Sequence, residues 1–575
     1  MVTVYVGIVW TRIFGLPKRH SREEFIIDKA ELNVTDKINN ILRYHPLGFY
    51  YQKRYQDKKN VGGGLQTRLI DGKEEEVMVG GVDIPVWDGY NNLLYENKTG
   101  EHCYYTFSGL VPRIIKILSD NGIEYKVVKQ YNADKIKVVD EKLNGIELRY
   151  YQSEAVELAK KKKRGILHLG TGAGKSLILA KLAQDIKGKV LIVVNRTTLF
   201  RQLIDTIKSA LNLSEEDINY FGDIKQYNPN NRITVATFQS LVTKEKVLVE
   251  GKGKKKKWKD ETVLKHKDVL ATIDCLCLDE GHHLSDNELG TLMKGCKNAI
   301  YRIGVSATPW RTDNADLMLE AHMGPILYKK TVSDLIREGY LAKPKIYMLK
   351  MPYDIDSKLS YGAMFKKLSR YEYKNKIMAD IAYRLASKGR SVLISFTRIE
   401  NLELVRAEID KINTNGLVVE NIIGEDTAEN KMEAVKKLNS GHFNIVLSTL
   451  FGEGVDVPEL STILLMRNSK SSVDAYQQVG RALRISKEFK GQKIVIDTLE
   501  QRVNADKDKV MKYEDIMDDF DMGNIEVEVT KETKNPDYFQ NHAMARLKVY
   551  QSEPEFEVKV IDSVDEIEEL KEGVK

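Results

Sequence analysis

The residues best suited to chemistry in this chain begin with a glycine-rich turn that ends in Gly174, Lys175 and Ser176. Glycines at positions 170, 172 and 174 allow the backbone to curl until successive N–H groups point towards an anion. The following helix adds partial positive charge at its amino end, Lys175 can reach terminal phosphates, and the Ser176 hydroxyl can ligate Mg²⁺. The first glycine of the strict phosphate-loop pattern falls on Leu169. The turn alone therefore leaves a structural glycine turn open as an alternative.

Two adjacent carboxylates form a second candidate centre, at the end of a later apolar run. Asp279 can hold Mg²⁺ directly or through water, and Glu280 can orient and deprotonate an attacking water. The hydroxyls of Ser306 and Thr308 end the next apolar run, where they could couple His282 to bound nucleic acid. Adjacent acids at a strand end are common on protein surfaces, but a phosphate loop upstream favours a nucleotide site.

Arg481 and Arg484 form a third candidate group in a stretch with helical spacing of apolar residues. Residues three apart lie on one face of a helix. From there both guanidinium groups could reach a γ-phosphate, where such arginines accelerate phosphoryl transfer by about 10³–10⁵. Alone they would indicate a solvated helix face. Together with the phosphate loop and the carboxylates they indicate a nucleotide hydrolase.

The elements that must position these residues alternate between strand and helix from about residue 148, which is typical of parallel sheets covered on both faces. Chemically capable residues fall at strand ends, where open α/β sheets place their sites. In the first half we predict strands at 165–169, 190–194, 233–236, 273–278 and 301–305. In the second half we predict strands at 391–395, 418–422, 444–447, 462–466 and 493–496, with helices at 401–409, 427–438 and 473–483.

Residues 1–138 predict a small α+β accessory domain that begins with a strand and contains a helix at 107–121. The region 87–95 favours a hairpin or a strand–turn–strand unit. The segment 44–55 mixes aromatic and basic residues, which suits either a nucleic-acid surface or a core of aromatic side chains. A nuclease interpretation of Asp88, Glu96 and Lys98 is disfavoured because no second acidic residue on a neighbouring strand can be identified.

The domain boundaries and one lysine-rich segment complete the expected organisation. The two parallel-sheet domains should span 139–342 and 343–500, joined by a linker at 339–345, and 501–575 should form a C-terminal extension with a strand at 550–558. The lysine-rich segment 251–259 predicts an exposed loop, either a solvated insertion or a contact to the DNA backbone.

Bulk properties limit the alternatives. The 575 residues carry a net charge of only +6, so binding to a polyanion would depend on local patches. We find neither an apolar run of membrane-spanning length nor an export signal. The four cysteines lack the paired spacing of zinc sites and give no sign of disulfides, which favours a reducing cytoplasmic location; they are Cys103, Cys275, Cys277 and Cys296.

In order and spacing, these residues resemble the motif set of the superfamily-2 helicases over about 148–497. Residues 149–152 resemble the adenine-reading motif, residues 170–176 motif I, residues 279–282 motif II in its DExH form, and residues 306–308 motif III. Residues 193–196 and 235–239 resemble the strand-contact motifs of the first domain. Residues 395–398, 448–458 and 477–484 resemble motifs IV, V and VI. The resemblance implies two tandem RecA-like parallel-sheet domains that bind Mg²⁺-ATP and a nucleic-acid strand.

The same resemblance implies roles for single residues. Gln152 would contact the base; Gly170, Thr171, Gly172, Ala173, Gly174, Lys175 and Ser176 would hold phosphates; and Gly454, Asp456 and Gln477 would also contact the nucleotide. Nucleic-acid phosphates would be held by Arg196, Thr237, Gln239, Thr397, Arg398 and Thr449.

Segments outside the motor narrow the resemblance to the phage UvsW family of branch-migration helicases, on residues 87–89, 93–95, 109–111 and 542–556. This family implies a DNA enzyme of recombination, repair and replication that remodels forks, Holliday junctions, D-loops or R-loops, the last with RNA as a partner. The segment 251–259 and the long N-terminal region depart from it. An RNA helicase, the motor subunit of a restriction or defence complex, and an ATP-switched clamp are the alternatives; Glu280, Arg481 and Arg484 argue against the clamp.

Overall fold

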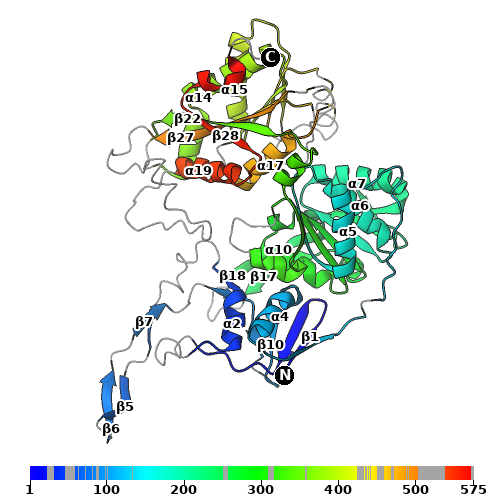
Figure 1. Ribbon diagram of the computed structural model, residues 1–575, viewed down its shortest axis with the longest axis vertical. Helices are drawn as coiled ribbons and strands as arrows, with labels where there is room; N and C mark the ends of the chain where they lie inside the picture. The colour runs from blue at the N-terminus through cyan, green and yellow to red at the C-terminus, as the bar shows by residue number, and fades with distance from the viewer. Residues whose placement is uncertain are drawn as a thin grey trace. The chain divides into compact units, whose positions relative to one another are not determined.

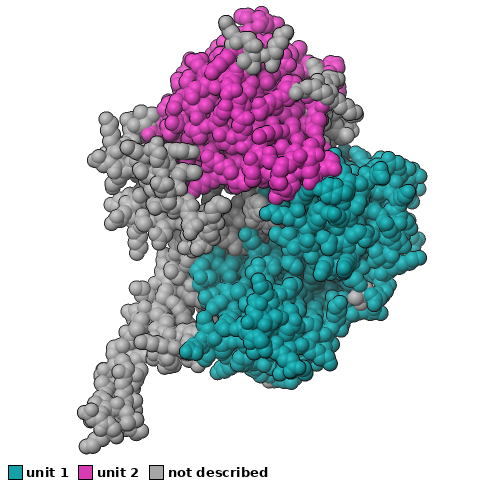
Figure 2. All heavy atoms as spheres, viewed as in Figure 1, with its two compact units in different colours: residues 1–169, 174–330 teal, residues 170–173, 331–575 magenta. Residues whose placement is uncertain are grey.

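The computed structural model forms two compact units (Figure 2). Unit 1 comprises residues 1–169 and 174–330, and unit 2 comprises residues 170–173 and 331–575. Among the described residues, no helix combines the length and the apolar character needed to cross a membrane. The structure describes residues 1–21, 31–45, 58–61, 64–70, 73–79, 82–85, 90–97, 99, 101–132, 134–249, 257–308, 316–355, 359–423, 433, 437, 440, 442–449, 459–467, 472–486, 489, 491–502 and 538–571.

Unit 1 opens with a mixed five-stranded sheet in the order β11-β1-β2-β10-β9. Only β1 and β11 run parallel; the other neighbours are antiparallel. Two helices pack on one face, α2 (Val34–Ile41) and α4 (Val111–Asp120), and bury residues such as Val4, Ile13 and Tyr104 (Figure 1). The strands are β1 (Val2–Val6), β2 (Trp10–Phe14), β9 (Tyr95–Glu96), β10 (Tyr104–Phe107) and β11 (Tyr125–Lys129).

The N-terminal predictions are confirmed in part. The initial strand is present, and the predicted helix is α4, preceded by the 3₁₀ turn η2 (Ser108–Leu110). Of the two alternatives for 87–95, the hairpin is wrong where the region is described, because β8 (Asn91–Asn92) pairs with β3 (Arg43–Tyr44) and β9 pairs with β10. β8 and β9 follow one another as separate short strands. Residues 46–57 and 86–89 lie outside the described part.

The remainder of unit 1 is an eight-stranded sheet in the order β15-β14-β16-β13-β19-β20-β12-β21, parallel except for β15. All five predicted strands are present; every residue of β13 is buried, as expected for a doubly covered strand. The strands are β12 (Arg164–Leu169), β13 (Val190–Val194), β14 (Ile218–Phe221), β15 (Lys225–Gln226), β16 (Ile233–Thr237), β19 (Cys275–Asp279), β20 (Tyr301–Ser306) and β21 (Ile326–Lys330).

Helices cover both faces of this sheet (Figure 1). On one face, α5 (Tyr150–Lys162), α6 (Lys175–Asp185) and α7 (Thr197–Leu211) lie next to one another. On the other, α10 (Asp286–Gly295) buries its leucines against β13 and β19, while α11 (Asp316–Met323) extends into the core of the N-terminal sheet through Met318 and Ala321. The N-terminal domain thus packs directly on a helix of the first parallel-sheet domain.

The lysine-rich segment differs from its prediction. Strands β17 (Val242–Val249) and β18 (Lys257–Leu264) form an antiparallel hairpin, so residues 257–259 belong to a strand and not to a loop. Residues 257–259 form a strand because they pair with residues 247–249 across the hairpin. The lysine-rich sequence gave no sign of this pairing. Residues 250–256 lie outside the described part.

Unit 2 is a parallel seven-stranded sheet in the order β24-β25-β23-β26-β27-β22-β28. Helices α14 (Glu372–Ser387) and α15 (Ile399–Ile412) cover one face, and α17 (Ser472–Ala482) and α19 (Tyr538–Gln551) the other (Figure 1). The predicted helix at 427–438 falls almost wholly outside the described part. The strands are β22 (Pro344–Tyr353), β23 (Val392–Ser395), β24 (Val419–Ile422), β25 (Ile445–Ser448), β26 (Thr462–Leu465), β27 (Lys493–Arg502) and β28 (Glu557–Ile561).

The end of the chain is built into unit 2. The strand predicted at 550–558 is wrong in position, because Tyr550 lies in α19 and the strand begins at Glu557, where β28 pairs with β22. From α19, Tyr550 buries its ring, and its hydroxyl donates to Asp497 at 3.0 Å.

Candidate active site

The phosphate-loop turn has the backbone that its glycines predict. Gly172 and Gly174 have φ values of +86° and +80°, in the left-handed region that other residues rarely adopt. Helix α6 begins directly after Gly174 without a side-chain cap. Since the first turn of a helix presents N–H groups that the helix itself does not bond, this end can receive an anion.

Gln152 lies against this loop. Its side chain is buried, its Oε1 accepts a hydrogen bond from the backbone N–H of Arg149 at 2.9 Å, and its Nε2 faces Gly174. A Cβ atom on Gly174 would lie only 2.3 Å from that Nε2. A side chain at position 174 would displace the Gln152 amide, so the residue predicted to contact the base lies at the edge of the loop.

The Glu280 carboxylate joins residues from three of the predicted motifs, all in unit 1. Lys175 forms an ion pair with Oε1, and the Ser306 hydroxyl donates to Oε2 at 2.6 Å. The backbone N–H of Ala307 approaches Oε2 at 3.3 Å, and the N–H of Thr308 donates to Ser306 Oγ at 3.1 Å. A carboxylate held by a cation and a hydroxyl at a strand end is suited to receive a proton from water once the cation moves to a phosphate.

The backbone at Glu280 is strained. Its φ is +50°, which is uncommon for any residue other than glycine. Such positions cost about 1–3 kcal/mol and cluster at functional sites. Asp279 ends β19 and pairs in register with Val305 of β20, so both acids lie beside the strand that carries Ser306. His282 lies in the turn η4 (Gly281–His283), and its side chain is outside the described part.

His168 belongs to this site and the sequence reasoning missed it. Its Nε2 lies 3.0 Å from the carbonyl oxygen of Ala307; because a carbonyl only accepts, Nε2 carries the proton. Burial, reinforced by Lys329, lowers the pKa of His168 to about 4, so the ring is neutral near pH 7. Its signal was present in the sequence, as the one polar side chain in the apolar run before the loop.

The two predicted arginines are not on one helix face. Arg481 lies in the last turn of α17, but α17 ends at Ala482 and Arg484 forms a β-bridge with Leu341. The helix stops because the Leu483 carbonyl accepts from the N–H of Ala342 at 2.7 Å. The prediction of a shared face is therefore wrong for Arg484.

Residues 170–173 of the loop belong to unit 2, where they pack against α17. A Cβ atom on Gly480 would lie 2.8 Å from Thr171 Cβ, so only a glycine allows this approach. Gly480 directly precedes Arg481, and Gln477 is buried one turn earlier in the same helix. Gly454 and Asp456 lie outside the described residues.

The residues predicted to hold nucleic acid fall at the carboxyl ends of neighbouring strands in each unit. In unit 1, Gln239 donates to the carbonyl and side-chain oxygens of Asn195, both at 3.1 Å, and so joins the two strand-contact motifs. In unit 2, Thr397 donates to the carbonyl of Arg467 at 2.8 Å. Arg196 and Thr237 follow or end β13 and β16, and Arg398 and Thr449 follow β23 and β25.

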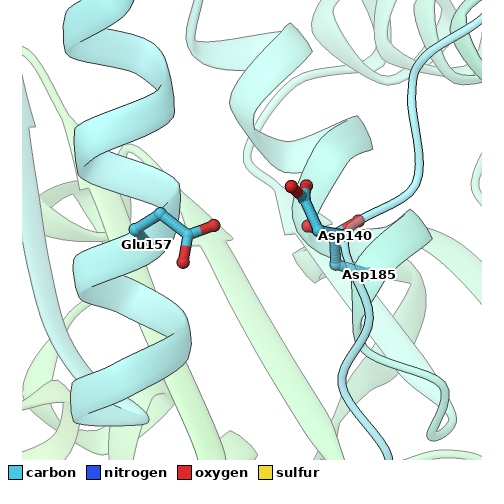
Figure 3. A group of neighbouring side chains, drawn as sticks. All are labelled: Asp140, Glu157 and Asp185. Carbon is cyan, nitrogen blue, oxygen red and sulfur yellow. The ribbon is translucent and has the colours of Figure 1, made fainter.

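A separate group of carboxylates consists of Asp140, Glu157 and Asp185 (Figure 3). Two lysines lie among them: Lys160 contacts Asp185 at 3.0 Å and Glu157 at 2.5 Å, and Lys181 contacts Asp140 at 2.5 Å and Asp185 at 2.9 Å. These ion pairs offset two of the three negative charges and tie residue 140 to α5 and α6. We interpret the group as structural.

Comparisons with known proteins show similarity to helicases and related motor proteins. Residues 145–311 match the family model described as type III restriction enzyme, res subunit, and residues 373–486 match the helicase conserved C-terminal domain. The DNA 3'-5' translocase XPB2 of Sulfurisphaera tokodaii is 26% identical over 415 residues, covering 64% of this chain and 88% of the relative. The ATP-dependent DNA helicase uvsW of Enterobacteria phage T4 is 26% identical over 430 residues, covering 69% and 79%.

A crystal structure of T4 UvsW aligns with 98% of this chain and 99% of its own at 17% identity, with a TM-score of 0.38. The family models and the curated relatives support an ATP-dependent helicase of superfamily 2 that acts on nucleic acid. Within that class it resembles the T4 helicase UvsW.

Proposed function

We propose that this helicase hydrolyses Mg²⁺-ATP to translocate on DNA and remodel branched DNA such as forks, four-way junctions and strand-invasion loops. The observation that carries the catalytic part is that Lys175 and Ser306 both contact the Glu280 carboxylate. These three residues belong to three separate motifs. The preference for DNA is supported by the relatives named as a DNA translocase and a DNA helicase.

In the proposed reaction, the incoming phosphates draw Lys175 away from Glu280. The uncovered carboxylate then takes a proton from water, whose oxygen attacks the γ-phosphorus while the bond to the β-phosphate oxygen breaks and ADP leaves. Ser306 and the Ala307 N–H hold the Glu280 carboxylate in place during this step. Gln152 contacts the adenine from the edge of the loop.

Asp279 and Ser176 offer oxygen ligands of the kind that Mg²⁺ prefers, and both belong to unit 1. When bound, the ion would neutralise charge on the β- and γ-phosphates. Arg481 of unit 2 is proposed to stabilise the negative charge that develops in the transition state, with Arg484 supporting it from the β-bridge. Hydrolysis would then need residues of both units, which couples it to a step along the strand.

The nucleic acid would be held by its phosphates through Arg196, Thr237 and Gln239 of unit 1 and Thr397, Arg398 and Thr449 of unit 2. Contacts to the backbone carry no sequence information, so recognition should depend on structure. Affinity should therefore fall steeply as salt rises, because each neutralised phosphate releases counterions.

Two other functions each have one observation in their favour. A relative named as a putative ATP-dependent RNA helicase of Acanthamoeba polyphaga mimivirus is 26% identical over 355 residues, which favours an RNA substrate. The family model that matches residues 145–311 is named after a subunit of type III restriction enzymes, which favours a motor that works with a nuclease partner.

ATP hydrolysis and strand separation on one panel of substrates distinguish these functions. The panel contains forked DNA, four-way junctions, R-loops, linear single-stranded DNA and RNA duplexes at one salt concentration. We expect the highest kcat and strand separation with branched DNA. Maximal stimulation by RNA duplexes would contradict the proposal and favour the RNA helicase. Stimulation by long unbranched duplex without strand separation would favour the restriction motor.

A further inference from the structure

The five-stranded N-terminal sheet has two faces of opposite character. One face is buried under α2 and α4 through residues such as Val4, Ile13 and Tyr104. The other carries Tyr5, Arg12, Tyr105 and Tyr95, which are direct cross-strand neighbours on β1, β2, β10 and β9. We name this second face, with Trp10 and Phe14, the aromatic face. A sheet with helices on one side and aromatic side chains on the other needs an explanation for its second side.

The rings of the aromatic face are arranged in contact and remain accessible. Tyr95 and Tyr105 stack with centroids 5.3 Å apart and an interplanar angle of 21°, and Trp10 lies 5.8 Å from Tyr105. Trp10 and Tyr105 are 40% and 37% exposed, although they contact one another and other rings of the same face. The side of these rings that faces away from the sheet is available to a flat ligand.

Charge on this face favours a polyanion. Strands β1, β2, β10 and β11 contain no Asp or Glu, and Arg12 and Lys126 lie on the same face of the sheet as Tyr5. Arg12 is exposed at the centre of the row, between Tyr5 and Tyr105. Within the described part of the chain it has neither a hydrogen bond nor an ion pair. A guanidinium between aromatic rings can pair with a phosphate while neighbouring bases stack on the rings.

A cavity of about 640 Å³ continues the row beyond Tyr95 and Tyr105, which also line it. Its walls include Arg19, Tyr44 and Tyr90. The two carboxylates at this cavity are already engaged: Asp286 accepts from Tyr44 at 2.7 Å, and Glu96 lies 3.3 Å from His102. The space is large enough for nucleobases, and aromatic side chains make up much of its wall.

We propose that the aromatic face binds unpaired bases of a DNA single strand, with the bases stacked on Trp10, Tyr105 and Tyr95 and a phosphate held by Arg12. Aromatic side chains on neighbouring strands of an open sheet can stack two or three bases in this way. The inference rests on the proposed DNA function, because a single strand is present wherever a branched substrate is opened. It adds a contact that reads unpaired bases, whereas the residues of the motor contact the backbone.

The test compares two probes on the full-length protein: a fluorescently labelled oligothymidylate and an oligonucleotide of equal length made of abasic sites. Tyr105→Ala and Trp10→Ala should each weaken oligothymidylate binding by roughly 5- to 100-fold, because a base loses its stacking partner. Binding of the abasic probe should stay within twofold of wild type, on the order of measurement error. Tyr105→Phe, which keeps the ring, should bind both probes like wild type.

Arg12→Ala should weaken both probes and reduce the slope of log affinity against log salt by about one phosphate. Tyr373→Ala is the matched control, because Tyr373 is a 51% exposed tyrosine on α14 of unit 2. ATP hydrolysis without nucleic acid should be unchanged in every variant. If the wild-type protein did not hydrolyse ATP at all, the proposed function would be contradicted. The binding measurements would still test whether the aromatic face binds single-stranded DNA.

Three outcomes would overturn the inference. Unchanged oligothymidylate affinity in both alanine variants would show that the rings do not contact bases and would favour a protein-docking face. An equal loss for the abasic probe would show that the face contacts only the backbone. A loss in Tyr105→Phe as large as in Tyr105→Ala would show that the hydroxyl, and not stacking, is responsible.

Discussion

Two lysine–glutamate pairs, one in each unit, have the same chemistry in opposite settings. Lys175 and Glu280 lie at a strand end, with side chains 17% and 11% exposed, and Glu280 has a left-handed backbone. Lys374 and Glu500 have side chains without any exposure and lie 2.6 Å apart. The first pair can exchange partners with a ligand, whereas the second is fully buried between α14 and β27 of unit 2.

The partners of the second pair explain its permanence. Thr498 donates to Glu500, and Arg546 of α19 reaches both Asp497 and Glu500. Burial alone would raise the pKa of Glu500, but Lys374 and Arg546 outweigh it and lower that pKa, so the carboxylate stays ionised. The comparison teaches that an ion pair marks a catalytic site only where strain, exposure and a strand end coincide with it.

Two arginines of unit 2 extend the comparison and give the largest expected effect. Arg481→Ala should lower kcat by about 10³–10⁵ while ATP still binds, because transition-state charge is left uncompensated. Arg546→Ala should instead lower stability, since Arg546 is fully buried against Asp497. Steady-state ATP hydrolysis with branched DNA and thermal unfolding of both variants provide the check. A destabilised Arg481→Ala with wild-type kcat would reverse the assignment.

The buried pair itself should determine stability. Lys374→Met leaves Glu500 buried without its nearest cation, and breaking such a pair costs about 3–5 kcal/mol. We expect a lower denaturant midpoint for the transition that includes unit 2, with hydrolysis per folded molecule retained. Lys175→Met is the matched control, in which hydrolysis is lost and the midpoint is kept. The same midpoint in both variants would remove the distinction between the pairs.

Ser306 should have a smaller effect on rate. Its hydroxyl donates to Glu280 at 2.6 Å, and hydrogen bonds to charged groups contribute about 1.5–3 kcal/mol. Ser306→Ala should therefore lower kcat by roughly 10- to 100-fold, with little change in KM for ATP. A rise in KM at constant kcat would instead assign Ser306 to nucleotide binding.

A further prediction is a pH dependence of stability that comes from His168. The pKa of this residue falls from 6.5 to about 4 in the folded protein, so below pH 6.5 the unfolded chain binds a proton that the native chain does not. Its contribution to stability is therefore complete above pH 6.5 and declines as the pH falls towards 4. Denaturant titrations of wild type and His168→Gln between pH 7 and 4 should show a steeper loss for wild type. Parallel curves would contradict it.

Local patterns predicted the parallel sheets well and the rest less well. Continuous apolar runs such as 190–194 could be recognised because a doubly covered strand is buried at every residue. The N-terminal sheet depends on β1 pairing with β11, more than 100 residues away, which local spacing does not encode. The end of α17 was missed because the Leu483 carbonyl bonds to Ala342, a tertiary contact.

At the site, residue types and spacing predicted Lys175, Glu280 and Ser306, which the structure brings together. They could not predict the strained backbone of Glu280 or the bond from His168 to Ala307, since both depend on how β12, β19 and β20 meet. They also could not show that Tyr105 is exposed while its neighbour Tyr104 is buried.

The most direct test of the catalytic pair compares Glu280→Gln with Glu500→Gln in one assay of ATP binding, single-turnover hydrolysis and unfolding. Glu280→Gln should bind ATP and unfold like wild type but fail to hydrolyse ATP. Glu500→Gln should hydrolyse ATP at the wild-type rate per folded molecule and unfold more easily. Hydrolysis near the wild-type rate in Glu280→Gln would contradict the assignment of Glu280 as the catalytic base.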